Sequence, residues 1–256
     1  MSCVFGKRAR DKEWAFTSAS LPRFYKGSNL GVLVCHGFGC TPSTMRGLYD
    51  TAVGRGCSAS LPLLTGHAKT LGELEKASYE DWRRDVGAAY DKLAEAGCDR
   101  IILCGLSLGA LLMTDLAARR ADDPRLAGVF LICPPIKMKG YLNFSAAIAP
   151  LIPYVQTADG FINGEFELYY GMATRKLKDI RAMSKLALEG AVKIKCPVSL
   201  VRAENDSRVN IKSYDMLKKR LPQAKLVEIK GAPHGIPYSD KSRELCDVFD
   251  GFLAGL

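Results

Sequence analysis

A serine stands between two glycines in the segment Gly105–Gly109, which reads Gly-Leu-Ser-Leu-Gly. The segment directly follows the apolar run Ile101–Cys104 and opens the helical pattern Leu108–Leu116, so it predicts a sharp strand-turn-helix junction. Neighbouring backbone comes so close to such a turn that side chains at its two glycines would collide. We therefore predict that Ser107 is exposed at the start of a helix and acts as a nucleophile.

A serine hydroxyl is a weak nucleophile at neutral pH, so it needs a histidine base that is oriented by a carboxylate. The chain has three histidines. His36 and His67 precede the serine, whereas the base of such a site comes last, in the chain order serine, acid, histidine. The predicted base is therefore His234, in a Gly/Pro-rich loop after the run Leu226–Ile229.

Two carboxylates compete for the role of the acid, and both follow the apolar run Val198–Val201. We favour Asp206, because it lies in the turn-rich Asn-Asp-Ser stretch beyond the end of the predicted strand. Glu204 lies closer to the strand, where it could face solvent or pair with Arg202. Glu204 remains the alternative.

Attack on a carbonyl group places negative charge on its oxygen, and each backbone N–H donor there contributes on the order of 3 kcal/mol. The predicted donors are the N–H groups of Leu108 and of Phe38. Gly37 and Gly39 allow the backbone to turn inward at Phe38, after the run Val32–Cys35. This chemistry needs no metal and no organic cofactor, and none is predicted.

Short apolar runs bounded by Gly, Pro or Asn alternate with helical patterns along the chain. This alternation is typical of a mostly parallel central sheet flanked by helices, an α/β fold. The predicted strands are Val32–Cys35, Ile101–Cys104, Val129–Ile132, Val198–Val201 and Leu226–Ile229. The last run alternates more than the others, so we expect it nearer an edge of the sheet.

Two helical patterns frame this sheet. Ser78 is predicted to cap a helix, with Asp81 at the reciprocal position of a capping box and Gly97 at its end. Trp82 opens an apolar stripe at three- and four-residue spacing, so we interpret it as a core residue. A second pattern, over residues 239–256, predicts a closing helix that packs on the sheet.

The pattern changes between residues 137 and 193, where a proline-broken apolar stretch, an aromatic segment and a helical pattern follow one another. We predict that residues 137–193 form an inserted cap on a core made of residues 1–136 and 194–256. Apolar side chains of the cap are predicted to line an acyl pocket, namely Ile148, Leu151, Ile152 and Tyr154. Alternatively, they only hold the cap to the core.

Composition limits the partners and the compartment. The formal net charge is +9, but the basic residues are scattered and no nucleic-acid-binding motif accompanies them, so no nucleic-acid partner is predicted. Nine cysteines without Cys-x-x-Cys spacing favour a reducing cytoplasm. The N-terminal residues lack the apolar run of a secretory signal, and no apolar stretch approaches the ~20 residues of a membrane span. We expect a cytoplasmic protein without stable membrane insertion; its oligomeric state stays open.

Four blocks of the chain resemble the α/β-hydrolase superfamily, and more closely its bacterial carboxylesterase and monoacylglycerol-lipase-like branch. The blocks are Cys35–Gly39, Leu61–His67, Gly105–Gly109, and Asn205–Val209 with the loop of His234. The resemblance implies an α/β-hydrolase fold with a small mobile cap, and the same triad and oxyanion donors as above. The chain departs from the family pattern at Ala68 and Ala110, where glycine is usual, and we interpret His67 as a structural loop histidine.

Together these features predict a serine carboxylic-ester hydrolase, either a carboxylesterase or a monoacylglycerol lipase. It would act through an acyl-enzyme on small to medium apolar esters, so its expected partner is a small-molecule ester substrate. The same triad could instead serve a thioesterase, an amidase, an acyltransferase or a carbon–carbon hydrolase. A non-catalytic receptor for a small apolar ligand is the alternative from a different class.

Overall fold

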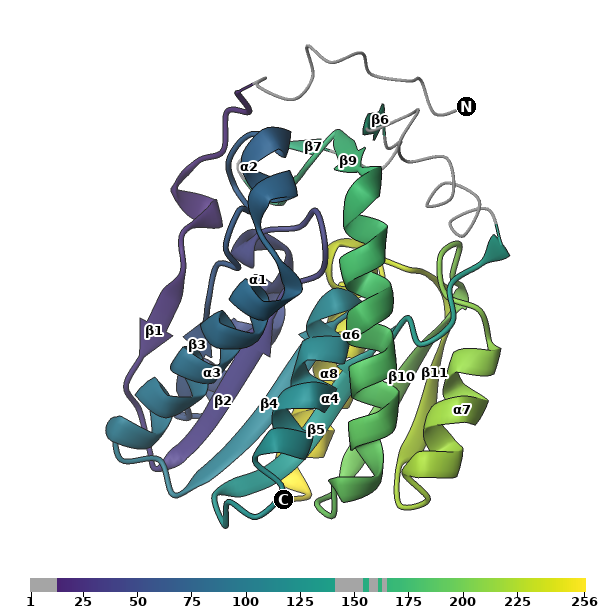
Figure 1. Ribbon diagram of the computed structural model, residues 1–256. Helices are drawn as coiled ribbons and strands as arrows, with labels where there is room; N and C mark the ends of the chain where they lie inside the picture. The colour runs from purple at the N-terminus through teal and green to yellow at the C-terminus, as the bar shows by residue number, and fades with distance from the viewer. Residues whose placement is uncertain (1–12, 141–153, 157–160, 163–164) are drawn as a thin grey trace.

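The computed structural model describes residues 13–140, 154–156, 161–162 and 165–256. Its centre is a seven-stranded sheet in the order β1-β3-β2-β4-β5-β10-β11 (Figure 1). The strands are β1 (Arg23–Tyr25), β2 (Leu30–Cys35), β3 (Ser58–Leu61), β4 (Arg100–Leu106), β5 (Leu126–Ile132), β10 (Val198–Asn205) and β11 (Lys225–Pro233). β1 pairs antiparallel with β3, and the remaining neighbours pair in parallel. The predicted mostly parallel sheet is confirmed.

All five predicted strands lie within strands of this sheet, and Leu226–Ile229 belongs to the edge strand β11, as expected. Strand β3 was not predicted, because it reads Ser-Ala-Ser-Leu and carries no apolar run. All four of its residues are nevertheless buried. Ser58 is satisfied there by accepting a hydrogen bond from the N–H of Gly27 and donating one to the carbonyl of Ser28. Hydrogen bonds to residues distant in the sequence thus make the burial of this polar side chain possible.

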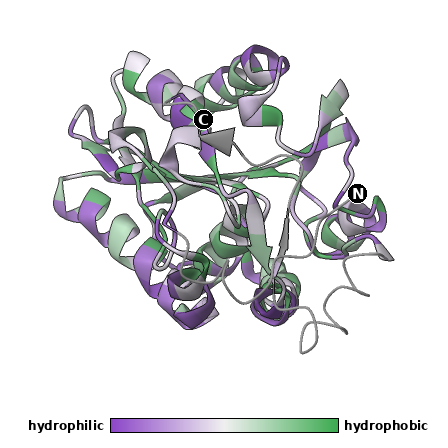
Figure 2. Ribbon diagram, turned by 90° about the horizontal axis from the view of Figure 1, so that it is seen from above, coloured by the Kyte–Doolittle hydropathy of each residue, from purple (hydrophilic) through white to green (hydrophobic). Residues whose placement is uncertain are grey.

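Helices cover both faces of the sheet (Figure 1). They are α1 (Arg46–Gly54), α2 (Leu71–Lys76), α3 (Tyr79–Glu95), α4 (Leu108–Arg119), α6 (Leu177–Gly190), α7 (Lys212–Arg220) and α8 (Ser242–Ala254). Helices α1 and α8 pack together on one face, and α3, α4 and α6 pack together on the other. Figure 2 shows hydrophobic residues on the sheet and on the helix sides that face it. Among the described helices, none has the length and apolar character to cross a membrane.

The predicted helix start at Ser78 is confirmed. The Ser78 side chain accepts a hydrogen bond from the N–H of Asp81, and the Asp81 carboxylate accepts one from the N–H of Ser78. Trp82 is fully buried, and its Nε1 donates to the carbonyl of Thr65 at 3.0 Å. Gly97 follows the helix with a φ of 96°, which glycine adopts readily.

Residues 137–193 contribute two short antiparallel pairs and the helix α6. β6 (Tyr154–Gln156) pairs with β9 (Gly171–Ala173), and β7 (Phe161–Ile162) pairs with β8 (Glu167–Leu168). Helix α6 packs along α4, so closely that a Cβ placed on Gly190 would lie 2.8 Å from the Cβ of Ala118. Ile148, Leu151 and Ile152 lie outside the described residues. The cap boundaries remain a prediction.

Glu167 on β8 joins three parts of the chain. Its fully buried carboxylate accepts hydrogen bonds from the N–H and the hydroxyl of Thr17 and from the hydroxyl of Ser20. Its own N–H donates to Oγ of Ser43 at 2.8 Å, and its carbonyl accepts from the hydroxyl of Thr41 at 3.0 Å. The side chain of Glu167 therefore holds the N-terminal segment against β8, and its backbone holds β8 against the chain that follows β2. Nothing in the sequence around Glu167 predicted this role.

Candidate active site

Ser107 follows β4 directly and caps the N-terminus of α4. Its backbone has a φ of 54° and a ψ of −114°, a conformation that non-glycine residues rarely adopt. The N–H of Ser107 donates to the carbonyl of Ile132 at 2.8 Å, and its carbonyl accepts from the N–H of Leu111 at 3.2 Å. The predicted strand-turn-helix junction is present, and it holds the half-buried Ser107 side chain where β4 ends.

The two glycines of the turn are required by space. A Cβ placed on Gly105 would lie closer to the backbone of Gly109 than the 3.0 Å that real Cβ atoms keep, and a Cβ on Gly109 would lie equally close to the carbonyl oxygen of Cys35. The backbones of β4, α4 and the end of β2 therefore meet without room for side chains. This confirms the steric reason for the motif.

His234 and Asp206 lie side by side. Nδ1 of His234 is 2.8 Å from Oδ2 of Asp206, and the two residues are 5% and 8% exposed. The other carboxylate oxygen, Oδ1, accepts hydrogen bonds from the N–H groups of Arg208 and Val209 at 2.7 and 2.8 Å. Burial alone would raise the pKa of Asp206, but the hydrogen bond and charge of His234 and the two N–H donors outweigh it and lower that pKa below its usual value. Asp206 is thus held ionised beside the imidazole.

The competing carboxylate points elsewhere. Glu204 is exposed, and its Oε2 accepts a hydrogen bond from the N–H of Gly231 at 2.8 Å. Arg202 forms its ion pair with Glu228 on the neighbouring strand, so the pairing of Glu204 with Arg202 considered above is wrong. Register explains this, because Arg202 and Glu228 are directly opposite each other in β10 and β11. Between the two carboxylates, the structure brings Asp206 to His234.

The backbone of the loop after β2 lies close to the serine. The carbonyl of Gly37 accepts hydrogen bonds from Nδ1 of His36 at 2.9 Å and from the N–H of Cys40 at 3.2 Å. Because the peptide is trans, the N–H of Phe38 lies on the side opposite these donors. A Cβ placed on Gly37 would lie 3.4 Å from the Cβ of Ser107, so the loop backbone lies against the serine. This geometry is compatible with Phe38 as an oxyanion donor.

The N–H of Leu108 is the second predicted donor. Leu108 is the first residue of α4, and the first N–H groups of a helix have no acceptor within it. The positive end of the helix dipole lies at the same place and favours a developing negative charge. Leu108 therefore has the position that the predicted role requires.

The two remaining histidines hold the loop of Phe38. Nε2 of His36 accepts from the N–H of Leu64 at 3.1 Å, which fixes Nδ1 as its protonated nitrogen. Nε2 of His67 accepts from the N–H of Gly39 at 3.3 Å. Burial lowers the pKa of His36 to about 4, and burial followed by the charge of His36 lowers that of His67 well below its usual value. Both are neutral at neutral pH, which agrees with the structural interpretation of His67.

Tyr154 is the described member of the predicted pocket residues. It is 2% exposed, and its hydroxyl donates a hydrogen bond to the carboxylate of Glu75 on α2. Arg175 pairs with the same carboxylate at 2.9 Å. Tyr154 thus ties β6 to α2, and contact with a substrate stays a prediction.

Cys133 belongs to the site but was missed in the sequence. Its Sγ, a carboxylate oxygen of Asp206 and a ring nitrogen of His234 lie within 4.8 Å of one another. A metal ion could take these three ligands only by displacing the proton between His234 and Asp206, which already share a hydrogen bond. Its position in the sequence could have pointed to it. Cys133 directly follows a predicted strand, so it lies at the carboxyl ends of the strands, where the other site residues also lie.

Comparisons with known proteins agree on the family. The model of the "Alpha/beta hydrolase family" matches residues 32–248. The thermostable monoacylglycerol lipase of a Bacillus species is 32% identical over 111 residues. These residues are 43% of this chain, and the match covers 44% of that relative. The carboxylesterase of Bacillus subtilis is 25% identical over 242 residues, covering 90% of this chain and 94% of that relative.

Solved structures show the same fold. A metagenome-derived lipolytic enzyme, described in work on LipS and LipT, superposes with a TM-score of 0.85 at 24% identity, covering 94% of this chain and all of that one. The monoacylglycerol lipase of Paleococcus ferrophilus superposes with a TM-score of 0.74 at 17% identity, covering 91% of this chain and 98% of that one. The matched family model spans the sheet from within β2 to β11, the serine turn, Asp206 and His234, so this chain belongs to the alpha/beta hydrolase family.

Proposed function

We propose that this chain is a serine ester hydrolase in which Ser107 is the nucleophile, His234 the base and Asp206 the acid. The observation that carries the proposal is the buried contact of 2.8 Å between Nδ1 of His234 and Oδ2 of Asp206. Both residues directly follow the carboxyl ends of parallel strands, as Ser107 follows the end of β4. With Nδ1 committed to the carboxylate, Nε2 is the nitrogen that can accept a proton. The family and the names of its relatives support the same chemistry.

The proposed reaction has two steps. His234 takes the proton of the Ser107 hydroxyl while Oγ attacks the ester carbonyl, and the N–H groups of Phe38 and Leu108 bind the resulting oxyanion. His234 then gives the proton to the departing alcohol, which leaves an acyl-enzyme. Water, deprotonated by His234, attacks the acyl carbon, and the acid leaves as Ser107 regains its proton.

We further propose small to medium apolar esters as substrates, which the relatives named carboxylesterase and monoacylglycerol lipase support. Residues 137–193 would act as the cap, with Tyr154 and the apolar residues near 150 at the acyl pocket.

A cytoplasmic location is supported by the eight cysteines of the described residues, all of which are free thiols. The proposal involves no nucleic-acid partner.

A panel of p-nitrophenyl esters from acetyl to dodecanoyl, with matched thioesters and anilides, tests the proposal on the parent protein and Ser107→Ala. We expect turnover that is strongest on oxygen esters and at least about a thousandfold lower kcat/KM in Ser107→Ala. A fluorophosphonate probe should label Ser107 in the parent and nothing in the variant. Ser18→Ala, at an exposed position, is the control.

Two results would contradict the proposal. Turnover that survives in Ser107→Ala would show that Ser107 is not the nucleophile. A parent protein that hydrolyses none of the esters would show that the chain is not an ester hydrolase. Preference for thioesters or anilides would move the protein to the thioesterases or amidases with the same triad.

A further inference from the structure

A thiol lies beside the acid and the base of the proposed triad. Cys133 is the first residue after β5, is fully buried, and has its Sγ within 4.8 Å of the ligand atoms of both Asp206 and His234. Its N–H donates to the carbonyl of Val201 at 3.0 Å, which fixes its backbone between β5 and β10. The position of the thiol is therefore set by the sheet and not by a mobile loop.

The backbone of Cys133 is unusual. Its φ of 48° lies in the left-handed region, which costs a residue with a Cβ roughly 1 to 2 kcal/mol and is normally given to glycine. Ser107 and Ala68 are the other described non-glycine residues with positive φ. A strained conformation that is retained next to a reactive site suggests that the side chain it places has a role there.

The thiol stays protonated. Burial, and after it the negative charge of Asp206, raises the pKa of Cys133 well above its usual value, so the group beside the carboxylate is S–H. The carboxylate accepts two backbone N–H groups at Oδ1 and His234 at Oδ2. An ionised carboxylate offers about four lone-pair sites. One site therefore remains for a fourth donor.

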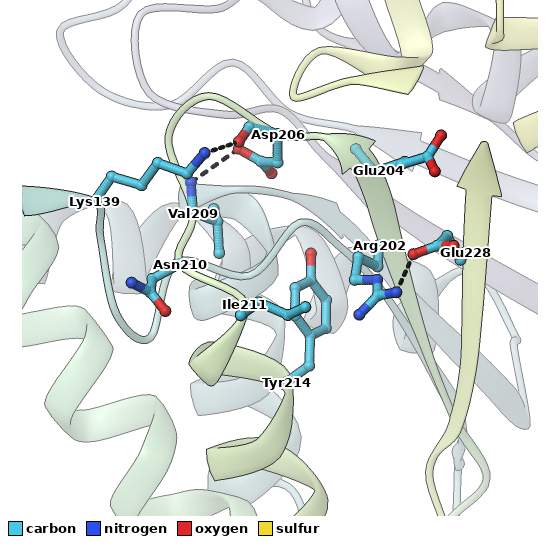
Figure 3. Close-up of a pocket in the computed structure, with 10 residues that line it drawn as sticks. Lys139, Arg202, Glu204, Asp206, Val209, Asn210, Ile211, Tyr214 and Glu228 are labelled. Atoms are coloured by element: carbon cyan, nitrogen blue, oxygen red, sulfur yellow. Dashed lines mark hydrogen bonds and ion pairs between the residues drawn. The ribbon is translucent and has the colours of Figure 1, made fainter. Parts of the chain in front are cut away.

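Tyr214 on α7 completes the surroundings of this thiol. It is 3% exposed, and its buried hydroxyl, which lies beside the Cys133 side chain, has no hydrogen bond to an oxygen or nitrogen of the described residues. Figure 3 shows this hydroxyl pointing towards the loop of Asp206, in a cavity of about 460 Å³ that Arg202 and Lys139 also line. Burial raises the pKa of Tyr214, so it too is neutral. Of the cations, Lys139 donates to the main-chain carbonyl of Asp206, not to its carboxylate.

We propose that Cys133 is a positioning residue, whose S–H donates a hydrogen bond to the Asp206 carboxylate. This hydrogen bond orients the carboxylate towards His234. It also reduces the negative charge that the carboxylate places beside the imidazole. The proposal rests on the proposed function, because it assigns Cys133 a part in the same triad. Without the S–H donor, Asp206 binds the Nδ1 proton more strongly and the protonated imidazole is favoured. The acid limb of the activity profile then moves to higher pH.

The test compares Cys133→Ala, which removes the donor, with Cys133→Ser, which keeps one. Cys98→Ala is the matched control, since Cys98 is equally buried but lies at the opposite end of the sheet, before β4. For Cys133→Ala we expect kcat lower by about three- to tenfold, KM within about twofold, and the acid limb of kcat/KM higher by about half a pH unit. Cys133→Ser should return both values most of the way to those of the parent.

A second readout does not depend on turnover. The proton between Nδ1 of His234 and Asp206 should give a low-field proton NMR signal, which we expect to move further downfield in Cys133→Ala and to return in Cys133→Ser. The inference is overturned if this signal and the acid limb stay at the parent values in Cys133→Ala, if Cys133→Ser fails to restore them, or if Cys98→Ala shifts them equally. If the parent hydrolyses no ester, the proposed function fails and the NMR signal alone decides the role of Cys133.

Discussion

Oε2 of Glu204 accepts a hydrogen bond from the N–H of Gly231 at 2.8 Å, and this bond joins the end of β10 to the last residues of β11. Asp206, two residues further along, uses its carboxylate on His234 at the same distance. The two candidate acids therefore point in different directions. The Glu204 side chain stays at the surface, whereas the Asp206 side chain is buried against His234.

The first prediction follows from that separation. Asp206→Asn should lower kcat by roughly 10²- to 10⁴-fold, because an amide cannot stabilise the imidazolium and can favour the wrong imidazole tautomer. Glu204→Gln should stay within about threefold of the parent, since an amide oxygen still accepts from Gly231. Steady-state kinetics with one p-nitrophenyl ester measures both. A larger loss in Glu204→Gln than in Asp206→Asn would exchange their roles.

The second prediction concerns the pH dependence of stability. The pKa of His36 falls from 6.5 in an unfolded chain to about 4 in the buried site, so the unfolded chain binds more protons between these values. Stability contributed by neutral His36 is therefore complete above about pH 6.5 and is lost as the pH falls towards 4, by about 3 kcal/mol in total. His36→Gln keeps an acceptor for the N–H of Leu64 and does not titrate. Urea unfolding from pH 4 to pH 7 should show a shallower slope for this variant.

That slope should be reduced and not abolished, because His67 also has a lowered pKa and loses stability as the pH falls below its usual value of about 6.5. Asp206, with its lowered pKa, adds a further loss below about pH 4. Equal slopes in the parent and His36→Gln would mean that His36 does not stay neutral in the folded protein.

The third prediction concerns space around the serine. Gly109→Ala should destabilise the fold by more than about 3 kcal/mol or prevent soluble expression, because its Cβ would overlap the carbonyl oxygen of Cys35. Gly251→Ala is the matched control on α8, where a Cβ meets nothing within 4 Å. It should raise the free energy of unfolding by about 0.5 to 1 kcal/mol. Thermal and urea unfolding distinguish the two, and a parent-like Gly109→Ala would disprove the close approach.

The fourth prediction concerns the buried carboxylate of Glu167. Ser20→Ala removes one of its hydroxyl donors and should cost about 1 to 3 kcal/mol, because a buried carboxyl oxygen then has one hydrogen-bond donor fewer. Ser18→Ala, at an exposed position two residues before Ser20, should change stability by less than about 0.5 kcal/mol. Chemical unfolding of both variants is the measurement. Equal effects of the two substitutions would show that Glu167 does not depend on Ser20.

Much of this fold could be predicted because the signals are local. Continuous apolar runs marked the central strands, and the Ser78 capping box marked the start of α3. Strand β1 and strand β3 could not be predicted this way, since β1 is a three-residue edge strand and β3 is held by pairing on both sides. Their backbone conformation depends on partners that are distant in the sequence.

The sequence by itself determined the turn around Ser107, because two glycines between a strand and a helix allow little else. It also predicted His234 as the base, through chain order and the small number of histidines. Only the tertiary structure decided between Glu204 and Asp206, gave His36 and His67 their hold on the loop of Phe38, and brought Cys133 to Asp206. Those relations depend on strand register and on the direction of side chains at the sheet edge. Strand register and side-chain direction cannot be inferred from residue type and spacing alone, because they depend on how strands distant in the sequence pair with one another.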